Sequence, residues 1–412
     1  MKAPELFKNK RDCSACSACF AACPKQAIRM EPDENGFLYP QIDEARCVGC
    51  GLCERVCAYQ HGPKRASEKE TYAAAAQDAD LARSASGGLF ASLAQAVLAQ
   101  GGVVFGCAME QEDGQLIARH VAVTELRDLP RLKGSKYVQS ETGTIYRDVR
   151  DQLQAGRTVL FSGTPCQAAG LRGFLQKDYD NLFVVDIVCH GVPSLRLFRD
   201  YLKHAEEAYG GRITDFRFRD KSTGWKLHGR MTIETADGHA KSVCFEPEES
   251  SYYQMFLNSY TYRENCYSCP YAGENRPGDV TIGDYWCIDL VHPEYLTQQG
   301  GKFDEQRGVS CLIINSAHGR ELLARYGQGI AREPSSYEQA ARYNAHLTRP
   351  SVLKEERAQV LALYREGGYA RVETWYQKRL KRIRFVRRLR AAVPRWAKDL
   401  LRPILKRAKR GL

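Results

Sequence analysis

The chain has 412 residues, 16 cysteines and a net charge of +11, and it is long enough for two or three domains with a sizeable core. No apolar run approaches the 18 residues that a membrane-spanning helix needs, which excludes that class of protein. The N-terminus carries no apolar signal segment, and clustered cysteines without export are typical of reduced thiolates. We therefore expect a cytoplasmic location.

Two copies of one cysteine pattern occupy the first 60 residues. Each copy has the spacing x2, x2, x3, and the second repeats the first 34 residues later. This is the bacterial ferredoxin pattern, in which three cysteines hold one 4Fe-4S cluster and the fourth reaches the other cluster. Structural zinc or disulfides would not explain the duplicated order. The expected ligands are Cys13, Cys16, Cys19 and Cys57 for one cluster, and Cys47, Cys50, Cys53 and Cys23 for the other.

The pattern of apolar and polar residues predicts the organisation of the rest of the chain. We expect a ferredoxin-like domain over 1–62, a polar, alanine-rich linker over 63–80, an alternating domain over 81–320, a helical extension over 321–377 and a basic tail over 378–412. The expected strands are Val103–Met109, Leu116–Val123, Thr158–Ser162, Leu182–Val188, Ile213–Arg219, Val280–Trp286 and Cys311–Asn315. The expected helices are 88–100, 141–155, 166–177 and 195–207, with a hairpin over 230–246 that turns at Asp237–Gly238. The predicted fold class is α+β, a ferredoxin-like domain followed by a mixed α/β domain and a helical basic tail.

Four of the eight remaining cysteines form a second candidate set. Cys166 and Cys189 each follow an apolar stretch that is expected to be a strand, and Cys266 and Cys269 form a CxxC pair. Cysteines at strand ends can lie side by side on one edge of a sheet, where a CxxC loop would complete four ligands. We hypothesise a third 4Fe-4S cluster here; the alternative is a CxxC turn and two buried thiols, since free cysteine packs as a small hydrophobe. Buried thiols are expected at Cys107, Cys244, Cys287 and Cys311.

Two glycine-containing segments are candidates for cofactor binding. The segment 84–90 (SASGGLF) precedes a helical stretch, and the N–H groups at a helix N-terminus suit a phosphate. The segment 133–137 (KGSKY) adds two cations, a hydroxyl and an aromatic ring that could cover a flavin. Each segment also fits a blander interpretation, a common helix cap or an exposed basic turn. Neither a Rossmann glycine motif nor a P-loop is present. The candidate contacts are Ser84, Ser86, Gly87, Gly88, Lys133, Gly134, Ser135, Lys136 and Tyr137.

Six segments in order resemble the family of beta subunits of coenzyme F420 hydrogenases and dehydrogenases, which also includes plant 7-hydroxymethyl chlorophyll a reductases. They are SASGGLF (84–90), KGSKYVQS (133–140), FSGTPCQAAGLR (161–172), DIVCHGVPS (186–194), CYSCPYA (266–272) and RPGDVTIGDYW (276–286). The resemblance implies a flavin-dependent iron–sulfur oxidoreductase that carries FAD, and it favours the third cluster because its four cysteines fall inside matched motifs.

The implied function is electron transfer between a ferredoxin-like or F420 partner, the clusters and FAD, with hydride transfer to or from an organic substrate. The alternative is an electron-transfer subunit that serves a larger hydrogenase or formate dehydrogenase. His190 is a candidate acid beside a flavin, with a satisfied structural histidine as the alternative, and Lys136 is a candidate hydrogen-bond donor to the flavin. Asp279 and Asp284 are expected to be turn residues or caps first and site residues second.

The tail is cationic and amphipathic. Residues 378–412 hold fifteen Lys/Arg and one acid, so the other 377 residues sum to −3. Apolar residues recur every three or four positions between Tyr376 and Ile404, interrupted by Pro394 and Pro403. Such a segment can lie on an anionic membrane, which would make the protein peripheral on the inner face of the membrane. The alternative is docking on this chain or on another protein of a complex, and no nucleic-acid partner is expected.

Overall fold

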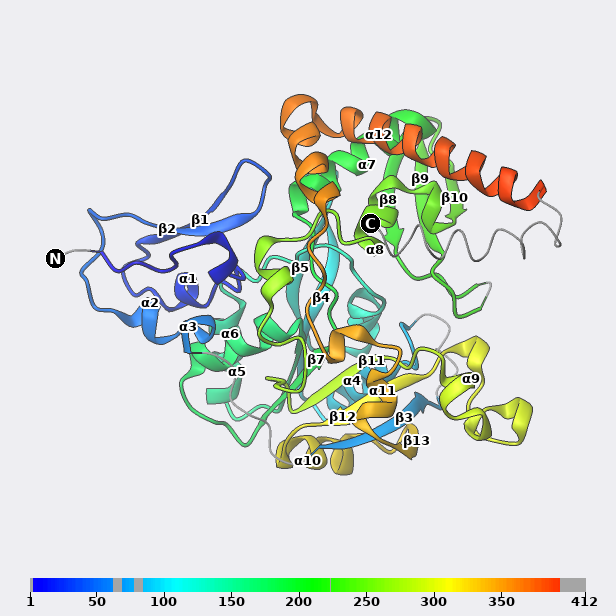
Figure 1. Ribbon diagram of the computed structural model, residues 1–412. Coiled ribbons are helices and arrows are strands. Elements are labelled where there is room, and N and C mark those ends of the chain that lie inside the picture. The colour runs from blue at the N-terminus through cyan, green and yellow to red at the C-terminus, as the bar shows by residue number, and fades with distance from the viewer. Residues whose placement is uncertain (1–2, 62–68, 78–83, 223, 393–412) are drawn as a thin grey trace, which may run out of the picture.

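The computed structural model describes residues 3–61, 69–77, 84–222 and 224–392. Its N-terminal lobe, blue in Figure 1, combines one antiparallel strand pair with short helices. Their bounds are β1 Ile28–Pro32, β2 Leu38–Ile42, α1 Ala18–Ala22, α2 Leu52–Arg55 and α3 Ala58–His61. Elements this short cannot bury much apolar surface, and the small core of the lobe includes the thiols of Cys19, Cys23 and Cys53.

An eight-stranded mixed sheet forms the centre of the molecule, in the order β13-β3-β12-β11-β7-β6-β4-β5. The neighbours β11, β7, β6 and β4 run parallel, and antiparallel strands flank them on both sides. The bounds are β3 Glu70–Ala76, β4 Val103–Glu112, β5 Gln115–Val123, β6 Val159–Gly163, β7 Leu182–Ile187, β11 Val280–Asp284, β12 Ser310–Ile314 and β13 Ile330–Ser335. Buried runs without alternation, as in β7 and β12, are typical of strands covered on both faces.

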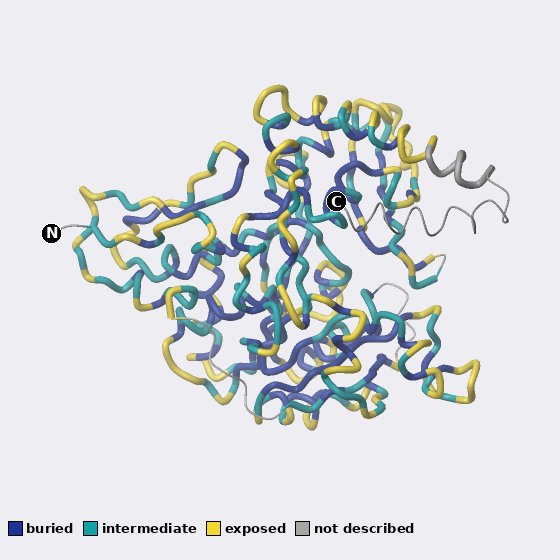
Figure 2. The backbone as a smooth tube through the Cα atoms, in the orientation of Figure 1, coloured by how far each residue is buried: buried dark blue, intermediate teal, exposed yellow. Residues whose placement is uncertain are grey.

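Helices cover both faces of this sheet, and Figure 2 shows much of the centre of the molecule in the dark blue of buried residues. On one face lie α4 Leu89–Ala99 and α10 Ala317–Tyr326, and on the other α5 Ile145–Gln154 and α6 Pro165–Leu175. The N-terminal lobe packs on the second face, where Ala18, Ala21 and Val56 join the same core as α5 and α6. The lobe is therefore continuous with the main body.

A second, three-stranded antiparallel sheet completes the fold beside the central one (Figure 1). Its apolar side packs on α7, α8 and the first part of α12. The bounds are β8 Gly211–Arg217, β9 Gly229–Thr235, β10 Ala240–Phe245, α7 Leu195–Tyr209, α8 Ser251–Leu257, α9 Ile288–Val291, α11 Tyr337–Ala341 and α12 Glu355–Ala392. The backbone leaves helical geometry at Gly367 and Gly368, so α12 is two helical segments joined by a kink.

The mixed α/β fold with an N-terminal ferredoxin-like domain agrees with the predicted class. All seven expected strands and four expected helices are present with small shifts at their ends, and the hairpin turns where Gly238 has φ +80°. Among the described residues no helix has both the length and the apolarity to cross a bilayer. Residues 393–412 of the basic tail lie outside the described part of the chain.

Two expectations about organisation are wrong. The segment 63–80 was expected to be a linker, but β3 pairs with β12 and β13 inside the sheet, because the alanines at 73–76 are small enough for a crowded interior. The segment 321–377 was expected to be helical, but β13 adds an edge strand there, so the central domain continues to Ser335. A third correction concerns Cys244, which is exposed on β10 and is not a buried thiol.

Candidate functional site

The two cysteine repeats share an unusual backbone conformation. Ala15 and Ser17 adopt left-handed φ values of 52° and 62°, and the residues 34 positions later, Gly49 and Gly51, adopt 63° and 69°. Alternating left-handed residues turn successive backbone N–H groups to one side, which is how anion-binding nests form. The N–H of Ala15 already points at the Sγ of Cys13, 3.4 Å away. The repeats are therefore shaped to surround a negatively charged group that carries sulfur.

The cysteines gather in the crossed combination that the spacing predicts. One small cavity is lined by Cys23 from the first repeat and by Cys47, Cys50 and Cys53 from the second. Burial raises the pKa of the Cys19 thiol well above its usual value, and the nearby thiols of Cys16, Cys13 and Cys57 raise it further. Because crowded thiols resist ionisation, thiolate ligands at these positions require a bound cation.

Two glycines on α6 let the N-terminal lobe approach the main body closely. A Cβ at Gly170 would lie 2.8 Å from the Cβ and Sγ of Cys16, and one at Gly173 would lie 2.3 Å from the carbonyl oxygen of Val56. Thr142 also donates a hydrogen bond to the carbonyl oxygen of Cys16. The first cysteine repeat is thus held directly against the helix that begins with Pro165 and Cys166.

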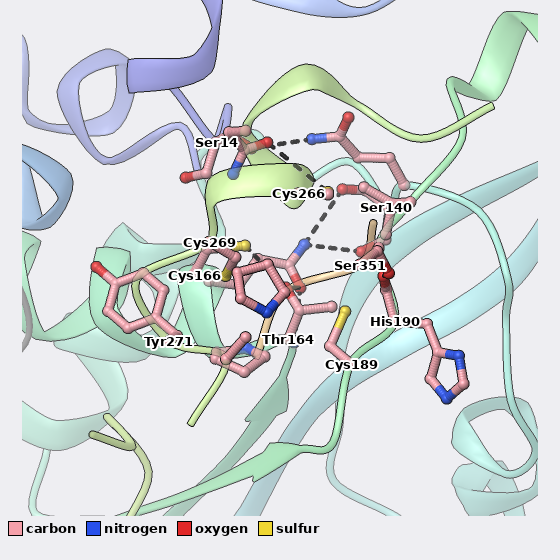
Figure 3. Close-up of a pocket in the computed structure, with 18 of the residues that line it drawn as sticks. Ser14, Ser140, Thr164, Cys166, Cys189, His190, Cys266, Cys269, Tyr271 and Ser351 are labelled. Atoms are coloured by element: carbon pink, nitrogen blue, oxygen red, sulfur yellow. Dashed lines mark hydrogen bonds between the residues drawn. The ribbon is translucent and has the colours of Figure 1, made fainter. Parts of the chain in front are cut away.

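Cys166, Cys189, Cys266 and Cys269 line a single cavity (Figure 3). Cys166 lies at the start of α6 and Cys189 just after β7; because β6 and β7 are adjacent and parallel, both thiols lie at the same sheet edge. Cys266 and Cys269 come from η5 Glu264–Ser268 and the residue after it. Burial, together with the neighbouring thiols of Cys166 and Cys269, raises the pKa of Cys189 to about 12.

Within the described ranges, no three or more His, Cys, Asp or Glu side chains are close enough to hold a single metal ion. A 4Fe-4S cube spreads its four thiolates over four iron atoms, so its ligands are further apart than those of one ion. The cavity offers four thiols, which are the ligands that a 4Fe-4S cube requires.

A buried ion pair fixes the CxxC loop to β7. The side chains of Arg276 and Asp186 are 1% and 0% exposed, and Nη2 of Arg276 lies 2.8 Å from Oδ1 of Asp186. Arg276 also donates to the carbonyl oxygens of Tyr271 and Ile187, and Asp186 accepts from the backbone N–H of Gly278. The pair therefore joins the segment after Cys269 to the strand that precedes Cys189.

A second and larger cavity lies beyond the cysteines, along the carboxyl ends of the parallel strands. Its volume is about 280 Å³, close to the lower end of the range of small-molecule sites. It is lined by Ser162 and Gly163 of β6, Ile187 of β7 and Ile282 and Gly283 of β11. Ligands of open α/β sheets bind at this edge. The two cavities share a wall made of Ser140, Thr164, Gln167 and His190.

The 84–90 segment enters this cavity as the N-terminus of α4. Gly88 caps the helix at φ +74°, and Ser84, Ser86 and the first helical turn line the cavity. A Cβ at Gly87 would lie 2.6 Å from the carbonyl oxygen of Ala74 on β3, so the close packing of this turn on the sheet requires glycine. The exposed N–H groups of a first helical turn suit a phosphate.

The 133–137 segment lines the same cavity, but Lys136 does not have the role expected of it. The ammonium of Lys136 donates to the carbonyl oxygens of Arg131, Leu132 and Lys133, which occupies its three protons. Burial lowers the pKa of Lys136. This geometry does not support a hydrogen bond from Lys136 to a flavin. Tyr137 instead stacks on Phe256, with ring centroids 4.3 Å apart.

Asp284 is a cavity residue and the centre of a polar cluster that the sequence did not reveal. It accepts hydrogen bonds from Ser86, Arg219 and Trp225, and the Arg219 side chain is only 2% exposed. The sequence motif around Asp284 indicated a possible site residue. Arg219 follows a strand of the second sheet, and no sequence motif indicated it. Asp279 keeps a structural role, because it is buried and accepts from Arg172, Ser316 and the Val184 N–H.

His190 lies at the boundary between the two cavities. Figure 3 shows its ring directed away from the cysteines, and it stacks on His346 with centroids 4.0 Å apart. Burial lowers the pKa of His190 and lowers that of His346 to about 3, so both rings are neutral at pH 7. The ring of His190 is positioned to contact a molecule in the larger cavity.

Comparisons with known proteins match two parts of this chain. Residues 12–61 match a 4Fe-4S dicluster domain, and residues 156–334 match the family described as the C terminus of the coenzyme F420 hydrogenase/dehydrogenase beta subunit. The fold and the cysteine sites thus define an iron–sulfur electron-transfer protein. Residues 156–334 thus match the C-terminal domain of the coenzyme F420 hydrogenase/dehydrogenase beta subunits, and residues 12–61 match a dicluster domain.

Individual relatives are distant. The chain is 24% identical over 331 residues to one of the subunits of the F(420)H(2) dehydrogenase of Methanosarcina mazei, an alignment that covers 76% of this chain and 87% of the relative. The VorC subunit of ketoisovalerate oxidoreductase from Methanothermobacter marburgensis is 35% identical over 51 residues, which are 12% of this chain and 65% of the relative. A solved structure of the F420-reducing NiFe hydrogenase complex of Methanosarcina barkeri covers 78% of this chain and 93% of its own, with 15% identity and a TM-score of 0.42.

Proposed function

We propose that this protein is an iron–sulfur flavoprotein oxidoreductase. It would pass electrons between a ferredoxin-like or F420 partner, three 4Fe-4S clusters and FAD, with hydride transfer to or from an organic substrate. A flavin exchanges electron pairs and a cube exchanges single electrons, so a chain that binds both converts two-electron transfer into one-electron transfer. The observation that carries the proposal is the wall shared by the four-cysteine cavity and the larger cavity.

Two contacts support a continuous route from the N-terminal lobe to this wall. Cys16 lies against Gly170 of α6, so the first repeat adjoins the helix that bears Cys166. Gln139 donates to the carbonyl oxygen of Ser14, which itself lines the four-cysteine cavity. The cluster sites would therefore follow one another from Cys23, Cys47, Cys50 and Cys53, through Cys13, Cys16, Cys19 and Cys57, to Cys166, Cys189, Cys266 and Cys269.

The larger cavity is the proposed FAD site. The segment with Ser84, Ser86, Gly87 and Gly88 would hold a phosphate, since Ser84, Ser86 and Gly88 line the cavity at the N-terminus of α4, where the helix favours an anion. Lys133, Gly134, Ser135 and Tyr137 would border the cofactor, and Lys136 would only stiffen this turn. His190 would contact the substrate or the ring system at the wall.

The first test is the iron, sulfide and flavin content of the protein purified without oxygen. The proposal requires about twelve irons and one FAD per chain. Cys266→Ser should lower iron by about four and leave flavin bound, whereas Cys244→Ser, an exposed thiol on β10, should lower neither. About eight irons in the wild type would refute the third cluster, and absence of flavin after addition of FAD would refute the hydride-transfer role.

A second candidate function is that of an electron-transfer subunit in a larger hydrogenase or formate dehydrogenase complex. The relative that aligns over most of this chain is named as a subunit of a dehydrogenase, which favours this candidate. Size-exclusion chromatography of the protein from its native cells separates the two. A stable complex with a large metalloenzyme supports the role of a subunit, and a chain that reduces substrate alone refutes it.

We also propose that the basic tail binds an anionic membrane surface. On its described part, Ile383 and Phe385 are 39% and 62% exposed beside several cations. Each Lys or Arg near such a surface contributes about 1 kcal/mol. Truncation after Phe385 removes ten of the Lys/Arg residues but keeps Leu380, which is buried on the body. It should abolish binding to phosphatidylglycerol vesicles; unchanged binding would refute the proposal, and neutral phosphatidylcholine vesicles are the control.

A further inference from the structure

Arg263 is a buried cation between two of the cysteine sites. Its side chain is among the largest that are fully buried in the described structure. The Nε group donates to the carbonyl oxygen of Cys13 at 2.9 Å, which places the guanidinium against the first cysteine repeat. Its own backbone forms the N-cap of η5, the element that carries Cys266. Arg263 therefore links the element that carries Cys266 to the N-terminal lobe.

Two nitrogens of the Arg263 guanidinium lack hydrogen-bond acceptors in the described structure. Both Nη1 and Nη2 are buried and lack a hydrogen-bond partner in the described structure. Among the ion pairs of the described residues Arg263 takes part in none; its charge faces the ring of Tyr39 instead, with Cζ 4.0 Å from the centroid. A buried charge without a counter-charge costs several kcal/mol. A buried arginine of this kind is stabilised when an anionic group accepts hydrogen bonds from its free N–H groups.

Arg263 contacts cysteines of two different sites. Its Nε donates to the carbonyl oxygen of Cys13, and its own carbonyl oxygen accepts from the backbone N–H of Cys266 at 3.1 Å. Cys13 belongs to the first cluster site and Cys266 to the four-cysteine site. For Cys23 and Cys47, which belong to the outermost site, no contact with Arg263 is recorded in the described structure.

We propose that Arg263 is a positioning residue that sets the potentials of two clusters at once, the one held by the Cys13 set and the one held by the Cys166 set. The inference rests on the cluster sites proposed above. Each cube gains one negative charge when it takes one electron, so a fixed cation beside it stabilises the reduced form and raises the potential. Hydrogen bonds from the free guanidinium N–H groups to cluster sulfur act in the same direction. Arg263 thereby makes these two sites easier to reduce than an apolar wall would.

The test is a redox titration followed by electron paramagnetic resonance, on full-length protein purified without oxygen. Dithionite supplies one electron to each cube. Iron analysis of the wild type comes first: about twelve irons establish the three proposed clusters before any variant is interpreted. About eight irons would refute the third cluster and restrict the test to the Cys13 site. In this way failure of the proposed function is separated from failure of the inference.

Three substitutions distinguish charge from packing. Arg263→Met should lower the reduction equilibrium constants of both clusters at least tenfold, about 59 mV more negative for one electron, while the outermost cluster keeps its potential. Arg263→Gln should behave like Arg263→Met, and Arg263→Lys should stay near the wild type. Lys10→Met is the matched control, because Lys10 lies over the same Tyr39 ring but is paired with Asp33 and Glu34.

Two outcomes would overturn the proposal. Unchanged potentials in Arg263→Met with full iron content would mean that the side chain only fills space. Equal loss of iron in all three Arg263 variants, the lysine included, would mean that the planar shape matters and the charge does not. Loss of iron in the two neutral variants alone, with wild-type potentials in Arg263→Lys, supports the charge as the cause.

Discussion

The Arg276–Asp186 pair allows a sharp prediction about the four-cysteine site. The substitution Arg276→Met removes two charged hydrogen bonds from the Asp186 carboxylate, from Nε at 3.2 Å and Nη2 at 2.8 Å. The carboxylate keeps the N–H of Gly278 and the hydroxyl of Thr281, but it remains buried and charged without a cation. Breaking a buried pair in this way costs about 3–5 kcal/mol.

The assay is urea denaturation followed by circular dichroism in the absence of oxygen, with iron content measured in parallel. Arg371→Met is the matched control, since Arg371 and Glu366 form an ion pair in which each side chain is 56% exposed. Exposed pairs contribute about 0–1 kcal/mol. We expect Arg276→Met to lower the unfolding free energy by several times the control value and to reduce iron by about four atoms.

A double variant isolates the cause. Asp186→Asn removes the negative charge but keeps an acceptor for Gly278, so Arg276→Met with Asp186→Asn should be more stable than Arg276→Met alone. Equal stability of Arg276→Met and Arg371→Met would refute the reasoning, as would a double variant that is less stable than the single one.

Further predictions concern backbone strain and pH. Gly87→Ala should destabilise the fold and weaken flavin binding, because its Cβ would lie 2.6 Å from the Ala74 carbonyl oxygen; Gly106→Ala, with no neighbour closer than 3.5 Å, is the control for stability. Burial lowers the pKa of Lys221 to about 7, with Arg219 adding to the effect, so the unfolded chain binds more protons between pH 7 and 10.5. The stability of the wild type relative to Lys221→Met should therefore rise with pH across that window, and a flat difference would contradict the assignment. Ala15→Gly should raise the urea midpoint, since Ala15 has φ 52° and glycine removes about 1 kcal/mol of left-handed strain; a lower midpoint would contradict this.

The sequence predicts those features of the site that depend on local order. Cys166 and Cys189 follow apolar runs, and adjacent parallel strands bring such positions to one edge. The duplicated spacing likewise predicts which cysteines of the two repeats gather. In both cases the geometry follows from residues that are close in the sequence or from a regular secondary structure.

Features that depend on contacts between distant segments could not be predicted in this way. Arg219 follows β8 of the second sheet, and only the tertiary fold brings it to Asp284, 65 positions later. The strand β3 was missed because alanine has weak strand propensity, and its partners lie far along the chain. Lys136 donates hydrogen bonds to three carbonyl oxygens because of the conformation of its loop, which no sequence motif predicts.

The position of β3 has a consequence for biosynthesis. Both of its neighbours in the sheet, β12 and β13, are translated more than 230 residues after it. At about 5–20 residues per second, the ribosome needs roughly 10–50 s to supply them. The cysteine repeats are synthesised before β3, so both are complete throughout that interval. During the same time the central sheet still lacks β12 and β13. Iron and sulfide delivery to the nascent N-terminal lobe can therefore precede closure of the central sheet.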